Sequence, residues 1–357
     1  MSSKSELHNY IKSIKELENS TFLVQEDSLI ADYEKSHKKH SLAIKILSIF
    51  GGLLASLAFI GFIFMFGIFS SGLGLLILGT ICLGFSTWIN AIYDDFLLDT
   101  VSVSLLIISF LLIAFGFAMY NLNESTISGI ILLLAVGVLA LSKNFISTFI
   151  SILLINGCLI SLLLFNNADN FIHLYAVVLA ILLVYTFLNE AKFITQSKKL
   201  NYLYNPLKSG LLVAFLATLI FLGKRGILYL NENLNWFSSV AIIALVLYLL
   251  FDLFPLLNIS KVNQKIGIIF LCAVLLLPTG ANPSIAGALL LLILCFKVNY
   301  KTGFVLSILS LIYFISQFYY DLTYSLLTKS VLLLSTGVLF LVLYFFVHKK
   351  LSDDEKL

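Results

Sequence analysis

The stretch ISGIILLLAVGVLALSKNFISTFISILLINGCLISLLLF, residues 127–165, contains one charged side chain, that of Lys143. Lys143 separates two apolar runs, residues 127–142 and 145–165. Because a helix rises 1.5 Å per residue, a run of about 20 residues crosses the roughly 30 Å of hydrocarbon in a bilayer. The stretch therefore predicts two transmembrane helices joined by a short turn.

The same pattern extends over most of the 357 residues. The chain is 60% hydrophobic and 11% charged, with a mean hydropathy of +1.03. A soluble globular protein has about 25% charged residues, and its surface needs them. We therefore expect the lipid bilayer to surround most of the chain, and we predict an all-α, polytopic transmembrane helix bundle.

Apolar runs of spanning length divide the chain into three parts. Residues 1–41 are predicted to form a short cytoplasmic helical segment, residues 42–347 the bundle, and residues 348–357 a cytoplasmic tail. The predicted spans are 42–69, 72–92, 98–119, 127–142, 145–165, 171–189, 207–223, 237–255, 263–278, 283–297, 302–319 and 326–347. This makes about twelve spans, or ten if the short pair within residues 263–297 forms a re-entrant hairpin instead of crossing the membrane.

The N-terminal segment has an amphipathic pattern. Leu7, Ile11, Ile14 and Leu17 fall on one stripe of a predicted helix, with charged residues opposite. A second short helix is predicted from about Glu26 to His40. Two short helices are too small to form a core of their own. We expect this segment to pack on the membrane surface or on another membrane or cytoplasmic protein.

Basic residues indicate how the chain is threaded. With the N-terminus inside, sixteen lysines near the predicted spans or in the tail are cytoplasmic, and only Lys224, Arg225 and Lys329 lie outside. Cytoplasmic loops of membrane proteins are enriched in lysine and arginine. The bias predicts that both termini are cytoplasmic. It also accounts for the net charge of +3 without a nucleic-acid partner.

No pattern of residues indicates a catalytic, cofactor or metal site. Cys82, Cys158, Cys272 and Cys295 all fall inside apolar runs and form no C-x-x-C pair, so they are expected to be small buried hydrophobes. None of the common hydrolase, protease or nucleotide-binding motifs occurs in the spans.

The stretch PTGANPSIAG, residues 278–287, is the first candidate functional segment. Pro278, Gly280, Asn282 and Pro283 interrupt two short apolar runs. Transporters build binding sites from such broken helices, whose free backbone groups bind ligand. A plain turn at the outer surface also fits, and we favour the turn by about two to one.

Two polar residues within spans are further candidates. Asn156 either contacts a substrate or ion on a pathway or hydrogen-bonds a neighbouring helix, with Gly157 permitting that helix to approach closely, and we favour the helix contact. Asp252 is a candidate because intramembrane acids are often functional. Pro255 follows it, however, which predicts that Asp252 lies near the cytoplasmic surface within reach of Lys261 or Lys265.

The stretch SQFYYDLTYSLLTKS, residues 316–330, places Asp321 and Lys329 between two apolar runs. In the twelve-span threading this stretch is an outer turn, in which Lys329 reaches the membrane boundary and its tyrosines join the interfacial aromatic belt. Asp321 is close enough in sequence to pair with Lys329. A surface turn explains the composition without a catalytic role.

The C-terminal third of the sequence resembles a known family. FYYDLTYSLLTKSVLLLSTG, residues 318–337, is similar to the C-terminal signature of the bacterial membrane family of unknown function DUF4401, through Tyr319, Tyr320, Leu327, Lys329, Ser330 and Gly337. The upstream PSIAGALLLLILCFKVNYKTG, residues 283–303, is similar as well. The resemblance implies a bacterial cytoplasmic (inner) membrane and supplies no activity or site residues.

Three functions remain, in order of preference. A non-catalytic membrane scaffold or accessory component fits the scarcity of deep charges and the N-terminal helical segment. A transporter or flippase of a small neutral or lipid-like substrate fits the span number and the interrupted segment 278–287. An intramembrane enzyme is the most remote alternative, because acid–base chemistry usually needs a positioned pair of groups and only Asp252 lies near the required depth.

Overall fold

The computed structural model describes residues 42–65, 71–92, 96–142, 144–224, 234–255 and 262–321, with seven further residues between 327 and 341. The described residues form twelve α-helices and one 3₁₀-helix, and they contain no β-strand. This confirms the all-helical fold class. The expected segment 1–41, the expected tail 348–357 and most of the expected span 326–347 lie outside the described residues.

The helices coincide with the other eleven predicted spans, with one short helix added. Their bounds are α3 (Leu42–Met65), α4 (Gly72–Ile92), α5 (Phe96–Met119), α6 (Glu124–Leu141), α7 (Phe145–Phe165), α8 (Phe171–Leu188), α9 (Glu190–Gln196), α10 (Lys198–Gly223), α11 (Asn235–Leu253), α12 (Val262–Leu276), η3 (Leu277–Ala281), α13 (Pro283–Lys297) and α14 (Lys301–Asp321).

Eight of the described helices are long and apolar enough to cross a membrane, namely α4, α5, α6, α7, α8, α10, α11 and α14. Three shorter apolar stretches lie in α3, α12 and α13. Many large apolar side chains point outward, and Phe50 on α3 and Phe85 on α4 are both more than half exposed. A chain with this surface is a multi-pass membrane protein, because water would not solvate it.

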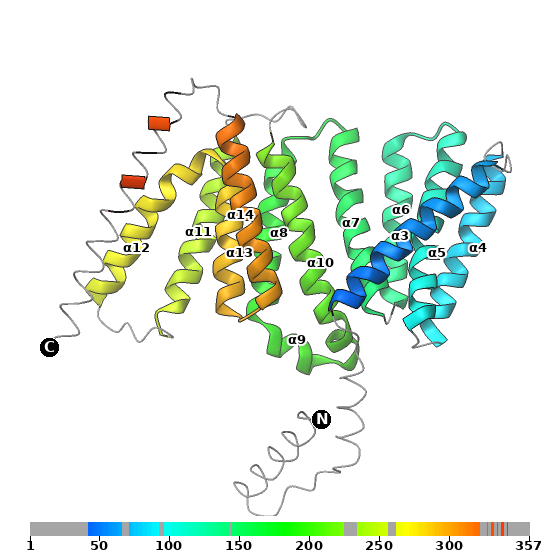
Figure 1. Ribbon diagram of the computed structural model, residues 1–357, viewed down its shortest axis with the longest axis horizontal. Helices are drawn as coiled ribbons and strands as arrows, with labels where there is room; N and C mark the ends of the chain where they lie inside the picture. Colours follow the sequence, from blue (N-terminus) through cyan, green and yellow to red (C-terminus); the bar gives the residue numbers. More distant parts are fainter. Residues whose placement is uncertain are drawn as a thin grey trace, which may run out of the picture.

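The bundle has two halves that meet at α7 and α10 (Figure 1). In the first half, α4 and α5 pack closely, and α3 lies across α5, where Gly52 approaches Val103. In the second half, α8, α10, α11 and α13 enclose the largest hydrophobic core. At the joint, a Cβ on Gly210 would lie 2.9 Å from Ile152, so the absence of a side chain allows α10 to approach α7.

The connections between the helices lie at the two ends of the bundle (Figure 1). α9 and the α6–α7 and α13–α14 connections lie at the lower end in Figure 1, and we call this the basic end because Lys192, Lys297 and Lys301 lie there. The α5–α6, α7–α8 and α12–α13 connections lie at the other end, which we call the opposite end.

One predicted boundary was wrong. The span 207–223 was expected to begin after Pro206, yet α10 begins nine residues earlier, at Lys198, and contains Pro206. Ser197 caps it, because its side chain accepts a hydrogen bond from the backbone N–H of Leu200. Proline removes one helical hydrogen bond, and here the helix continues on both sides of that gap.

The sequence did not decide whether α12 and α13 cross the membrane or form a re-entrant hairpin. Each helix has 15 residues, which corresponds to about 22 Å of rise. In Figure 1 both helices run alongside α11, between the basic and the opposite end. The 3₁₀-helix η3 joins them at the opposite end.

Candidate functional site

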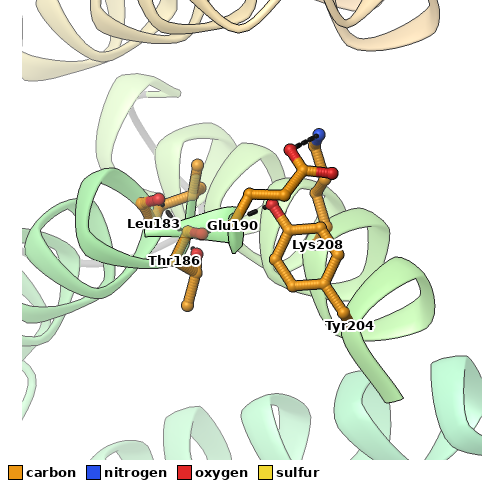
Figure 2. A network of polar contacts seen from close by, with 5 residues as sticks. All are labelled: Leu183, Thr186, Glu190, Tyr204 and Lys208. Carbon is orange, nitrogen blue, oxygen red and sulfur yellow. Dashed lines mark hydrogen bonds and ion pairs between the residues drawn. The ribbon is translucent and has the colours of Figure 1, made fainter. Parts of the chain in front are cut away.

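A lysine enclosed by aromatic rings lies at the basic end of the second half. The side chain of Lys208, on α10, is 9% exposed, and its Nζ lies 3.4 Å from Oε2 of Glu190, the first residue of α9 (Figure 2). An ammonium group that leaves water needs a compensating charge. Glu190 supplies that charge, and its own side chain remains 38% exposed.

Three aromatic rings complete the surroundings of Lys208. Its Nζ lies 4.6 Å from the ring centre of Tyr300, 4.8 Å from that of Phe187 and 5.6 Å from that of Tyr204. Ring faces attract cations at distances within about 6 Å. We call Lys208, Glu190, Phe187, Tyr204 and Tyr300 the lysine cage.

The rings come from three separate elements. Tyr204 lies one helical turn before Lys208 on α10, and its hydroxyl donates to the backbone oxygen of Thr186 at 3.4 Å (Figure 2). Thr186 in turn donates to the backbone oxygen of Leu183. These bonds fix the end of α8, from which Phe187 reaches the lysine cage.

Tyr300 is positioned by the end of α13. Asn299 has a left-handed backbone, with φ of 54°, and the backbone N–H of Tyr300 donates to the oxygen of Cys295 at 2.9 Å. This is a Schellman-type helix end, in which asparagine takes the place usually occupied by glycine. Burial raises the pKa of the Tyr300 phenol, and the adjacent Cys295 raises it further. Tyr300 is therefore neutral near pH 7.

The lysine cage links α8, α9, α10 and the α13–α14 turn through one buried charge. Removing the Glu190 carboxylate would leave the buried Lys208 ammonium without compensation, so this ion pair holds the elements together. In the sequence, Lys208 is only one of the sixteen lysines predicted to be cytoplasmic. The available signal was the four-residue spacing of Tyr204 and Lys208, which puts both on one face of a helix.

A second polar network lies at the basic end of the first half. Asn90, on α4, donates to Oγ of Ser147 on α7 at 2.7 Å and accepts from Asn144 at 2.8 Å. Asn144 also donates to Asp99 at the start of α5. We call Asn90, Asp99, Asn144 and Ser147 the asparagine network. It connects α4, α5 and α7, and no local sequence pattern predicts it.

Asn156 lies inside the bundle, on α7. It is 7% exposed, its amide donates to the backbone oxygen of Ile152 at 2.6 Å, and its Oδ1 accepts from the hydroxyl of Tyr175 on α8. Both ends of the amide therefore have partners within the chain. The expected role of Gly157 was wrong, because a Cβ there would have nothing within 4 Å.

Asp252 lies at the basic end, where it forms an ion pair with Lys297, the last residue of α13. Its side chain is 47% exposed. Lys261, one of the two expected partners, lies outside the described residues, so its contact with Asp252 stays a prediction. The observed partner is neither of the two expected lysines and comes from another helix 45 residues away. His173 contacts Ser238 near the start of α11, and Asp252 lies 14 residues further along that helix, which corresponds to about 20 Å. The two groups do not form a catalytic pair.

The segment 278–287 is a tightly packed turn. Pro278 and Gly280 lie in η3, where a Cβ on Gly280 would lie 2.9 Å from the Trp236 ring of α11. Asn282 caps α13, because its Oδ1 accepts from the backbone N–H of Ser284 at 3.0 Å, and Pro283 is the first residue of that helix. Asn282 is 7% exposed.

The turn is also tied to α10. The hydroxyl of Ser284 donates to the backbone oxygen of Leu219 at 2.6 Å. A Cβ on Gly287 would lie 2.6 Å from the Leu219 side chain, so a residue without a side chain is needed there. The small residues of this segment thus serve helix packing.

Asp321 is the last residue of α14 and accepts hydrogen bonds from the amide of Gln317 at 2.9 and 3.1 Å. The rings of Tyr319 and Tyr320 lie edge to face, with centres 5.8 Å apart. Lys329 lies outside the described residues, so its pairing with Asp321 stays a prediction.

Two observations concern ligands. Among the described residues, no group of three or more histidine, cysteine, aspartate or glutamate side chains is arranged to hold a metal ion. A shallow apolar groove of 340 Å³ lies on α4, lined by Gly84, Phe85 and Trp88. Its apolar lining suits an acyl chain of the surrounding lipid.

Comparison with known proteins gives one match. The family model "Domain of unknown function (DUF4401)" matches residues 41–350, which covers the whole described bundle. No curated protein and no solved structure matches the chain.

Proposed function

The chain belongs to the DUF4401 family, and from that premise we propose that it is a non-catalytic scaffold or accessory component of a bacterial cytoplasmic membrane. One observation carries the proposal: Lys208, Asp252 and Asn156, which chemistry could use, are each engaged with another side chain of the bundle. Lys208 binds Glu190, Asp252 binds Lys297, and Asn156 binds Tyr175. An acid–base catalyst needs such groups within reach of a substrate.

The charges support one orientation. The basic end carries Lys192, Lys208, Lys297 and Lys301, and Lys224 is at the end of α10 on the opposite side. By the positive-inside rule the basic end faces the cytoplasm. The proposed topology has twelve spans with both termini inside, so that α12 and α13 each cross a locally thinned bilayer.

The proposed scaffold needs a partner, and residues 1–41 are the proposed docking segment. Its predicted stripe of Leu7, Ile11, Ile14 and Leu17 offers an apolar surface on the cytoplasmic side. A partner that presents an apolar groove would bury this stripe, as amphipathic helices are buried in helix-in-groove complexes.

In-cell photo-cross-linking tests the function. We expect a cross-linker at Ile11 or Ile14 to give one discrete adduct with another protein, because these positions lie on the stripe. The matched control at Lys12, on the charged side of the same predicted helix, should give much less of it. If all three positions yield only lipid adducts or adducts with copies of the chain, the scaffold proposal fails.

A transporter or flippase of a small neutral or lipid-like substrate is the second candidate. Two short helices interrupted by η3, with prolines at 278 and 283, are the observation that favours it. The apolar groove on α4 is compatible with a lipid-like substrate. Transport requires water to reach polar groups within the bundle, which separates the two candidates experimentally.

A further inference from the structure

Two buried polar atoms in the second half have no hydrogen-bond partner among the described residues. They are Nε2 of His173 on α8 and Oγ of Ser239 on α11. His173 is 1% exposed and Ser239 is fully buried. A buried polar group without a partner costs about 1–3 kcal/mol, and native proteins usually satisfy such groups with protein atoms or an ordered molecule.

We infer the tautomer of His173 from its neighbouring hydrogen bonds, because the roles of the two ring nitrogens depend on which of them carries the proton. Its Nδ1 lies 3.1 Å from Oγ of Ser238, and that hydroxyl donates its single proton to the backbone oxygen of Asn235, also at 3.1 Å. Oγ of Ser238 is therefore the acceptor, and Nδ1 is the donor. In the neutral imidazole the other nitrogen, Nε2, then carries a lone pair. The group without a partner is a hydrogen-bond acceptor.

The surroundings restrict what can bind there. His173 follows Ile172, which is fully buried, and Ser239 lies one turn before Ile242, which is also fully buried. α11 packs against α8, η3 and α13. An anion offers no proton to Nε2, and a cation would lose its hydration in apolar surroundings at a high cost. A small neutral molecule with an O–H group can donate a proton to Nε2 and brings no charge into the apolar surroundings.

We propose that α8 and α11 hold one small neutral hydroxyl compound, of which water is the smallest, whose O–H donates to Nε2 of His173. The proposed second contact is the hydroxyl of Ser239, which is fully buried one residue beyond Ser238 and has no partner among the described residues. The site lies toward the opposite end of the bundle, beside the packed turn at residues 278–287. This inference is independent of the proposed scaffold function.

Two substitutions of His173 separate its nitrogens, because an asparagine amide reaches the position of Nδ1 and a glutamine amide reaches that of Nε2. In an occupied site, H173N keeps the bond to Ser238 but loses the contact with the bound molecule, and H173Q does the reverse. We expect both variants of the full-length chain in nanodiscs to lower the Tm by about 2 °C or more. We expect S239A to lower it as well.

Wild-type or higher Tm values for both H173N and S239A would overturn the proposal. If the site is empty, removing an unpaired polar group from it does not lower the stability of the fold and can raise it. A second measurement does not depend on folding of the variants. The ¹⁵N spectrum of histidine-labelled wild-type protein should show one histidine protonated at Nδ1, with magnetisation transfer to its ring from bound-water protons or, for a larger hydroxyl compound, from carbon-bound protons. Protonation at Nε2, or no transfer from either source, would also overturn it.

Discussion

Replacing Glu190 with glutamine is expected to destabilise the bundle more than replacing its partner Lys208 with methionine. E190Q leaves the Lys208 ammonium, 9% exposed, without a carboxylate. Breaking a buried pair in this way costs about 3–5 kcal/mol, and the three ring faces offset part of that cost. We expect the free energy of unfolding to fall by about 3 kcal/mol.

K208M behaves differently because the remaining charge can reach water. Glu190 is 38% exposed, so its carboxylate hydrates once the ammonium is gone, and the methionine side chain fills the space among the rings. The loss of one partner is costly when it leaves an uncompensated buried charge, and the Glu190 carboxylate is not confined in this way. We expect K208M to cost less than about 1 kcal/mol, and the double variant E190Q/K208M to resemble K208M.

Equilibrium unfolding in mixed detergent micelles, followed by circular dichroism, measures both effects. K192M is the matched control, because Lys192 lies on the same short helix as Glu190 with an exposed side chain. It should leave stability unchanged. If K208M proves as costly as E190Q, contacts between Lys208 and the aromatic rings hold the lysine cage together. The claim that the ion pair with Glu190 does so would then be wrong.

The second large effect is expected from Gly79→Val on α4. A Cβ at position 79 would lie 2.8 Å from Cγ1 of Ile113 and 3.2 Å from the backbone nitrogen of the same residue. The backbone of α5 cannot retreat from a valine side chain without separating the two helices. Overpacking of this kind costs about 1–3 kcal/mol, and we expect the upper part of that range.

Gly84→Val is the matched control on the same helix. A Cβ at position 84 would have nothing within 4 Å, because Gly84 faces the apolar groove beside Phe85 and Trp88. Thermal unfolding of the two variants in one detergent should show a clear loss of Tm for G79V and no loss for G84V. Equal losses would mean that valine disturbs α4 itself and not its contact with α5.

The sequence predicts the helices well because their signal is local. An apolar run of spanning length predicts both that a helix forms and approximately where that helix begins and ends. Residues 145–165 and 283–297 show this. The exceptions are also local. α9 has only seven residues of mixed polarity, and α10 begins nine residues before the predicted span 207–223 and continues through Pro206.

The polar contacts were less accessible because they join residues far apart in the chain. Asp252 pairs with a lysine 45 residues away, and Asn90 with a serine 57 residues away. Counting lysines locates a membrane end but does not tell which lysine turns inward, so Lys208 was not distinguished from its neighbours. For Asn156 the sequence favoured a contact between helices, and the structure supplies Tyr175 as its partner.

The central claim is that the polar residues of the bundle serve contacts between helices and do not line a water-filled path. Substituted-cysteine labelling tests it most directly, on a background in which Cys82, Cys158, Cys272 and Cys295 are replaced. N156C and N282C are the test positions, each 7% exposed in the native residue. Exposed Asn121 and Lys301, at opposite ends of the bundle, provide the accessible controls.

We predict that a membrane-impermeant thiol reagent labels N121C only from outside the cell and K301C only from the cytoplasm, while N156C and N282C stay unlabelled from either side. Labelling of N156C or N282C at the rate of the controls would contradict the account. A water-filled path would then reach the interior of the bundle, and transport would replace the scaffold as the proposed function.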